Sequence, residues 1–252
     1  MTFRPMLVVT ILVTLQLGSV ASVFAQGILF DDFSLPFIRG DRWKTDQPES
    51  GDGSGLETLR LVSNGALLLV HRVAGGQLLD LGSHISAARL YFNPSTVRAL
   101  KFDVTVLSMT ATGCSVPGSN FTDVEARMWT QLFRNGALEV QASVGVVRTS
   151  MANEMRAIGG VNGLGLSGVD LGPVAVGTPL TLRLSWDPAN NRVDFQRNND
   201  PVQSVTYTVD DSMSISSPFV LMEAVGFVAN CTVGARPSGV VSALFDNVFI
   251  TP

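Results

Sequence analysis

One short polar stretch near the middle of the chain holds the residues best suited to bind a ligand. Glu125, Arg127, Trp129 and Gln131 occupy alternate positions, so in a β-strand they share one face. An aromatic ring that covers the C–H face of a sugar, with polar side chains around it for the hydroxyls, is typical of glycan-binding surfaces. These four residues, with Asp103 from a preceding strand, are therefore the candidate ligand-binding set.

The same pattern continues in the neighbouring segments. If the strands around Leu100, Val124 and Leu138 form a meander, one sheet face collects many polar side chains: Lys101, Asp103, Thr105, Glu125, Arg127, Trp129, Gln131, Glu139, Gln141 and Ser143. An ordinary solvated sheet face with one covered tryptophan accounts for this pattern equally well. Both interpretations stay open.

Two acids in this stretch also have the spacing for chemistry. Asp123 and Glu125 lie two residues apart and so on one strand face. Glycoside hydrolysis with retention uses two carboxyl groups about 5–5.5 Å apart, one as nucleophile and one as acid. Solvated strand charges are the alternative interpretation of this pair.

Alternation of apolar and polar residues dominates the whole chain and predicts half-buried strands. Clear examples are residues 100–106, 124–132, 138–144 and 180–186. Asn64-Gly65 and Asn135-Gly136 separate such runs, and both dipeptides favour tight hairpins. About a dozen short strands with close turns and no long amphipathic helix predict an all-β fold, a two-sheet antiparallel β-sandwich.

Three segments resemble those of bacterial secreted concanavalin A-like lectin/glucanase domains, which have a jelly-roll fold. They are FDDFSLPFIRGDRW at 30–43, LTLRLSWDPANNRVDFQRN at 180–198 and ALFDNVFI at 243–250. The resemblance implies that the first and last strands lie side by side. Each segment is common to many sandwiches, so the resemblance supports the fold more than any activity.

Glycanases of this superfamily carry an E-x-D-x-x-E pattern on one inward-facing strand. Here Asp123 and Glu125 stand in reversed order, and Met128 occupies the place of a third acid. The missing motif favours an exported, non-catalytic protein that binds a glycan or another extracellular polymer. The alternatives are a structural or cell-surface interaction protein without a small ligand, and a divergent glycoside hydrolase.

The terminal strands offer a weak candidate site for calcium, and no other cofactor is expected. Asp31, Asp32 and Asp246 would come together if these strands pair, and carboxylate oxygens suit Ca²⁺. Capping of turns and strand edges explains the three acids as well.

The N-terminus predicts an exported chain, secreted or periplasmic. Arg4 precedes an apolar run at 6–17, and small residues lead to Ala25. The run is shorter than the roughly 18 residues of a membrane span, so no span is expected in the mature chain. We expect residues 1–25 to be a signal peptide and 26–252 a single β-sandwich domain.

The charge balance excludes nucleic acid as an expected partner. The chain carries 17 Lys+Arg against 21 Asp+Glu, and the basic residues are scattered rather than clustered. The expected partner is instead a polysaccharide or a cell-surface glycan.

Cys114 and Cys231 are the only cysteines of this exported chain, and an oxidising compartment favours a disulfide between them. Two free thiols are the alternative, because the sequence does not show that the two residues are close.

The signal peptide gives a first testable prediction. Protein secreted by a host that recognises the signal should have an intact mass that corresponds to a chain starting at or near Gln26. A mature product that retains Met1 would contradict the prediction.

Overall fold

The computed structural model describes residues 27–44, 55–75, 83–114, 122–163, 165, 167–216, 218–229 and 235–252. These residues form 15 strands and one short 3₁₀ helix. In chain order they are β1 (Ile28–Asp31), β2 (Gly55–Ser63), β3 (Ala66–Ala74), β4 (Ser83–Phe92), β5 (Ala99–Thr112), β6 (Asp123–Asn135), β7 (Leu138–Thr149), β8 (Met155–Asn162), β9 (Ser167–Val174), β10 (Pro179–Asp187), η1 (Pro188–Asn190), β11 (Arg192–Arg197), β12 (Gln203–Thr206), β13 (Met213–Ser214), β14 (Val220–Ala229) and β15 (Ser238–Thr251).

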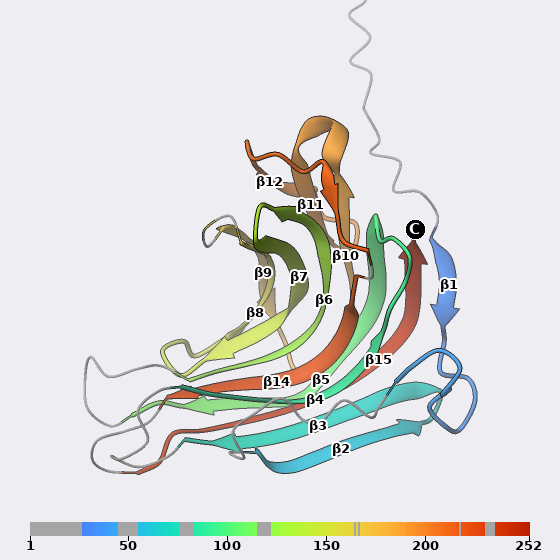
Figure 1. Ribbon diagram of the computed structural model, residues 1–252. Coiled ribbons are helices and arrows are strands. Elements are labelled where there is room, and N and C mark those ends of the chain that lie inside the picture. Colours follow the sequence, from blue (N-terminus) through green and yellow to red (C-terminus); the bar gives the residue numbers. More distant parts are fainter. Residues whose placement is uncertain are drawn as a thin grey trace, which may run out of the picture.

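The strands form two antiparallel sheets that face each other (Figure 1). The first sheet has the order β12-β11-β10-β5-β15-β3-β2, with β1 added to β15. The second has the order β4-β14-β6-β7-β8-β9, with β13 added to β6. The second sheet is strongly curved, and its outer face is the hollow side of the molecule (Figure 1). The all-β sandwich predicted from the sequence is confirmed.

The core lies between the sheets and follows directly from the alternating pattern. Phe102 and Leu182 of the first sheet and Met128 and Met222 of the second have no exposed surface. One buried polar group joins the sheets: the ring of His71 on β3 hydrogen-bonds to Ser86 on β4 at 2.8 Å and to Thr58 on β2 at 3.1 Å. Buried polar groups need such partners, so His71 has a structural environment rather than a catalytic one.

The expected meander of β5, β6 and β7 is wrong. β6 and β7 pair with each other, but β5 belongs to the other sheet, where it pairs with β10 and β15. Alternation along a strand shows which side chains turn inward. It does not show whether two such strands pair in one sheet or face each other across the core, because both arrangements give the same pattern. Lys101, Asp103 and Thr105 therefore lie on the opposite side of the molecule from Glu125.

The two Asn-Gly turns differ in detail. Asn64 and Gly65 join β2 to β3 with φ of 54° and 76°, the positive values that a type I′ turn requires. In the β6–β7 hairpin Asn135 still pairs with Leu138, so the turn residues are Gly136, with φ of 62°, and Ala137.

The glycine-rich segment 159–172, which the sequence favours as a flexible loop, is largely the β8–β9 hairpin. The segment 49–55, which the sequence also predicts to be a loop, lies outside the described residues except for Gly55. The expected signal peptide and Cys231 lie wholly outside them. No described helix is long and apolar enough to cross a membrane.

The first and last strands lie side by side, as the resemblance implies. β1 pairs with β15 through Ile28–Ile250 and, after a bulge, Asp31–Val248. This pairing joins the N-terminal strand of the sandwich to the centre of the first sheet, close to the C-terminus (Figure 1).

The Cys114–Cys231 disulfide stays a prediction, with support from the strand register. Cys114 lies two residues after the end of β5, and Thr112, the last residue of β5, pairs with Ser238 at the start of β15. Non-reducing peptide mapping of exported protein should find the two cysteines in one linked peptide. Cys114→Ser should lower the free energy of unfolding by roughly 3–5 kcal/mol. Two alkylatable thiols in the native protein would contradict the bridge.

Candidate functional site

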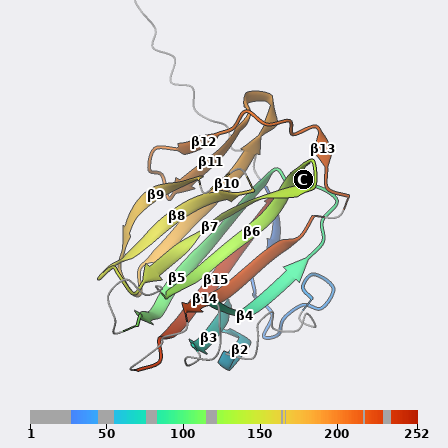
Figure 2. The same ribbon diagram turned by 60° about the vertical axis from the view of Figure 1, so that its left-hand side comes forward.

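The outer face of the curved sheet carries the candidate site, and β6 runs through its middle (Figure 2). A groove of about 460 Å³ crosses this face from β6 to β9. Its lining combines charged side chains with several small residues: Glu125, Arg127, Ser143, Ile158, Gly159, Gly160, Asn162, Ser167, Gly168, Val169 and Asp170.

Three of the five residues in the predicted ligand set lie together on this face. Glu125, Arg127 and Trp129 alternate along β6 with buried residues that face the core. Gln131 lies at a β-bulge and is only 6% exposed; its Oε1 accepts a hydrogen bond from the backbone N–H of Phe219 at 3.0 Å. Asp103 lies on the other sheet and accepts a hydrogen bond from Thr181 at 2.6 Å, so it belongs to a different surface.

A buried carboxylate that the sequence analysis missed organises these residues. Glu223 on β14 is 1% exposed and faces Arg127 in the strand register. Its Oε1 accepts hydrogen bonds from Arg127 Nε at 2.8 Å and from Trp129 Nε1 at 3.0 Å. The Arg89 guanidinium on β4 lies 3.2 Å from Oε2 on the other side. The only signal in the sequence is a single acid within the apolar segment VLMEAVGFVA.

Arg127 bridges this buried acid to the outer one. Its Nη2 lies 2.7 Å from Glu223, and its Nη1 donates to Glu125 Oε2 at 2.7 Å. Burial by itself would lower the pKa of Arg127, but the charges of Glu125 and Glu223 outweigh it and raise that pKa above its usual value. Arg89, Glu223, Arg127 and Glu125 thus form one row of alternating charges across three strands, the Arg–Glu row.

A missing side chain on β7 makes room for the arginine. Gly145 pairs with Arg127, and a Cβ at this glycine would lie 2.4 Å from Arg127 Cβ and 2.6 Å from the carbonyl oxygen of Ala126. Gly160 on β8 and Gly168 on β9 continue the strip of small residues outward. Gly160 and Gly168 line the groove and carry no side chain that would fill it.

Asp123 begins β6 on the same side as Glu125 and has a different environment. Burial, followed by the charge of Glu125, raises the pKa of Asp123 to about 7, although Arg127 acts in the opposite direction. Its Oδ1 is buried and has no hydrogen-bond partner within the described chain. One acid that holds its proton near neutral pH therefore lies beside one that is ion-paired, a combination typical of acid–base sites.

The calcium candidates have other partners. Asp31 is buried and accepts hydrogen bonds from Trp43 Nε1 at 2.8 Å and from the backbone N–H of Phe33 at 3.0 Å. Asp32 caps Ser34, and Asp246 accepts a hydrogen bond from the backbone N–H of Asn247 at 2.7 Å. Burial raises the pKa of Asp246, and the nearby charges of Asp103, Asp32 and Asp31 act in the same direction. In the part of the chain that is described, no group of three or more metal-ligating side chains is assembled.

No protein-family model and no curated protein matches this sequence. Solved structures with the same fold do match. A laminarinase from Flavobacterium sp. UMI-01 is 9% identical with a TM-score of 0.51, over 88% of this chain and 100% of that one. A glycoside hydrolase family protein from Mycobacterium thermorestibile is 13% identical with a TM-score of 0.51, over 89% and 100%. LamAcat from Zobellia galactanivorans is 10% identical with a TM-score of 0.50, over 90% and 99%.

These structures overturn the expectation of a non-catalytic protein. The chains that share the fold over 88–89% of this sequence include a laminarinase and a glycoside hydrolase family protein. At such low identity the likeness itself shows the concanavalin A-like fold alone.

The contact between Gly145 and Arg127 gives a stability prediction. Gly145→Ala should lower the free energy of unfolding by about 1–3 kcal/mol, because the methyl group displaces Arg127 from the Arg–Glu row. Gly160→Ala is the matched control, since its Cβ would meet no atom closer than 3.6 Å and should cost less. Equal denaturation midpoints for the two variants would contradict the role of Gly145.

Proposed function

We propose that this chain is a glycoside hydrolase that cleaves laminarin or a related glucan in the groove over β6–β9. Asp123 is the proton donor and Glu125 the nucleophile. The observation that carries the proposal is the contrast between the two acids: the pKa of Asp123 is raised to about 7, whereas Glu125 is ion-paired to Arg127 at 2.7 Å.

The spacing of the two acids suits a retaining reaction. Residues two apart on a strand have Cα atoms roughly 6.6 Å apart and point to the same side. Carboxyl groups on such positions can approach the separation of about 5–5.5 Å that a retaining mechanism uses.

In the first step Asp123 would donate its proton to the glycosidic oxygen while a Glu125 oxygen attacks the anomeric carbon. The bond from that carbon to the leaving oxygen breaks, and the shortened glucan departs as an alcohol. In the second step the Asp123 carboxylate takes a proton from water, which attacks the anomeric carbon and releases Glu125. Both acids return to their starting states.

The remaining residues of the site have supporting roles. Arg127 stabilises the charge of Glu125, and Glu223 holds Arg127 in place through two guanidinium nitrogens. Trp129 lies next along β6 and offers an aromatic surface for a sugar ring beside the reacting acids. The small residues of β7–β9 leave space for the chain of a polysaccharide.

An extracellular polysaccharide is also consistent with the N-terminal sequence. We infer that residues 1–25 direct export and that the mature protein meets its substrate outside the cytoplasm.

The pH dependence of hydrolysis tests the assignment of the acid. Asp123 must be protonated to donate, so kcat/KM on laminarin should fall as the pH rises above about 7. Asp123→Asn should lower kcat by about 10²–10⁴-fold and remove this limb of the profile. Because the charged form of Asp123 is disfavoured by burial, this variant should melt no lower than the wild type at pH 8.

Two further variants complete the test. Glu125→Gln should abolish turnover, whereas Asp210→Asn, which changes an exposed acid in the loop before β13, should leave it unchanged. Release of reducing sugar from laminarin and a panel of other glucans is the readout. Wild-type protein that is folded and cleaves none of them, or an Asp123→Asn variant of unchanged activity, would overturn the proposal.

A further inference from the structure

The outer face of the first sheet, on the opposite side of the molecule from the groove, is apolar over part of its area. On β10 and β11 the outward side chains are polar, as is usual for a sheet face in water: Thr181, Arg183, Arg192 and Gln196. On β2, β3, β15 and β5 seven apolar side chains point outward and form what we call the apolar strip: Leu59, Leu61, Leu68, Val70, Val240, Leu244 and Leu107. Leu59 and Leu107 are 39% and 42% exposed, and the other five are partly exposed. Contiguous apolar surface of this kind is typical of interaction sites.

The sequence of β3 carries the same signal. Residues 66–70 read ALLLV, an unbroken apolar run, whereas a strand with one face in water alternates between apolar and polar residues. Leu67 and Leu69 turn inward and have no exposed surface, so Leu68 and Val70 turn outward. Continuous apolar runs are typical of strands that are covered on both faces. In the described part of the chain, a second sheet covers only the inner face of β3.

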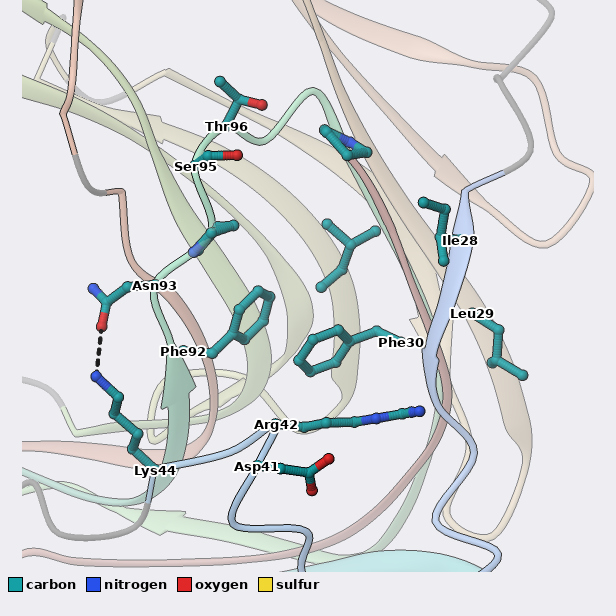
Figure 3. A pocket seen from close by; sticks show the side chains of 13 residues that line it. Ile28, Leu29, Phe30, Asp41, Arg42, Lys44, Phe92, Asn93, Ser95 and Thr96 are labelled. Carbon is teal, nitrogen blue, oxygen red and sulfur yellow. Dashed lines mark hydrogen bonds between the residues drawn. The ribbon is translucent and has the colours of Figure 1, made fainter.

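The aromatic side chains at the β1 end of the sandwich are, by contrast, already in contact with one another. Phe30 and Phe92 line a pocket of about 610 Å³, and their rings stack with centroids 4.2 Å apart (Figure 3). Trp43 packs edge-on against both rings, and the guanidinium carbon of Arg42 lies 5.8 Å from the centroid of the Phe30 ring. These rings therefore have partners within the chain. The leucines of the apolar strip project from a sheet face against which no second sheet packs.

Opposite charges lie at the two ends of the apolar strip. Arg72 is exposed on β3 at one end. At the other end Asp103 on β5 and Asp246 on β15 are directly opposite each other in the strand register, an arrangement in which like charges repel. Uncharged groups hold the two acids: the hydroxyl of Thr181 donates to Asp103, and the side-chain amide of Asn247 donates to both acids. Neither acid forms an ion pair with a described residue, so a cation from outside would be stabilising at this end.

We propose that the apolar strip is the interface of a homodimer, in which two copies of this chain pack with the outer faces of their first sheets together. A two-fold axis that lies between these faces and crosses the strands at the centre of the strip brings the leucines of one copy onto those of the other. Because this axis exchanges the two ends of the strip, it also places Arg72 of each copy over Asp103 and Asp246 of the other. The groove of each copy stays open on the outside of the dimer, so the inference does not depend on the proposed hydrolysis.

The size of the apolar strip sets the expected strength of the dimer. Four strands about 4.8 Å apart, with four outward positions about 6.7 Å apart along each strand, cover roughly 500 Å² per copy. A dimer would then bury roughly 1,000 Å² in total, which is at the lower end for specific interfaces. We therefore expect reversible association with a dissociation constant of about 1–100 µM.

Sedimentation velocity of the exported chain over about 1–300 µM tests the proposal, and the wild type should shift from monomer to dimer across this range. Leu68→Gln/Leu244→Gln should raise the dissociation constant at least about 10-fold, and both positions point out of the sheet, so the fold should be retained. The matched control Leu138→Gln/Met151→Gln removes two exposed apolar side chains at the start of β7 and in the turn after it. This control should change the dissociation constant less than about twofold.

An exchange of charges tests how the two copies are oriented. Arg72→Glu should weaken association at least about 10-fold, and Arg72→Glu/Asp246→Lys should restore it to within about threefold of the wild type. Asp123→Asn should dimerise as the wild type does, so failure of the hydrolase proposal would not affect this result. A wild type that stays monomeric over the whole range would mean that another partner covers the strip and would overturn the inference. Equal effects of the two glutamine double variants, or no recovery in a folded charge-exchange variant, would overturn it as well.

Discussion

The ion pair between Arg127 and the buried Glu223 is the constraint on which the rest of the candidate site depends. A carboxylate that is 1% exposed is stable only when its charge is compensated, and here one guanidinium lies on each side of it. Removal of one partner would leave a buried charge, which costs far more than the pair contributes. Arg127 therefore cannot leave the face of the sheet, and Gly145 beside it cannot acquire a side chain.

The two acids near this fixed arginine differ in their surroundings. Glu125 lies within hydrogen-bond distance of the Arg127 guanidinium. Asp123, two residues earlier at the start of β6, is partly buried and experiences the negative charge of Glu125. Burial and repulsion together exceed the attraction of Arg127, so the pKa of Asp123 rises to about 7. Two neighbouring carboxyl groups of β6 thus have different environments: Glu125 is ion-paired to Arg127, and burial raises the pKa of Asp123.

Much of this arrangement is visible in the sequence, but only within each strand. Alternation along residues 123–132 correctly placed Glu125, Arg127 and Trp129 on one face, and the alternation of residues 100–106 correctly buried Phe102. Alternation does not reveal which strands are neighbours, so Asp103 was assigned to the wrong surface. The sequence does not predict the role of Glu223, because its partners, Arg89 and Arg127, come from strands far away in the chain.

The same limit explains why the absence of the E-x-D-x-x-E motif does not exclude the proposed hydrolase: a linear pattern misses groups that come from other strands. E-x-D-x-x-E places all its acids on one strand, whereas here the charges next to Glu125 come from Arg127 on its own strand and Glu223 on the next. The pKa of a carboxyl group can be shifted by any nearby charged or hydrogen-bonding group, whether that group lies on the same strand or on a neighbouring one. In a site that lacks the family's sequence motif, the catalytic acids are therefore better identified in the structure, as neighbouring side chains that have different environments. Asp123 and Glu125 are such a pair, and the groove beside them begins at Glu125.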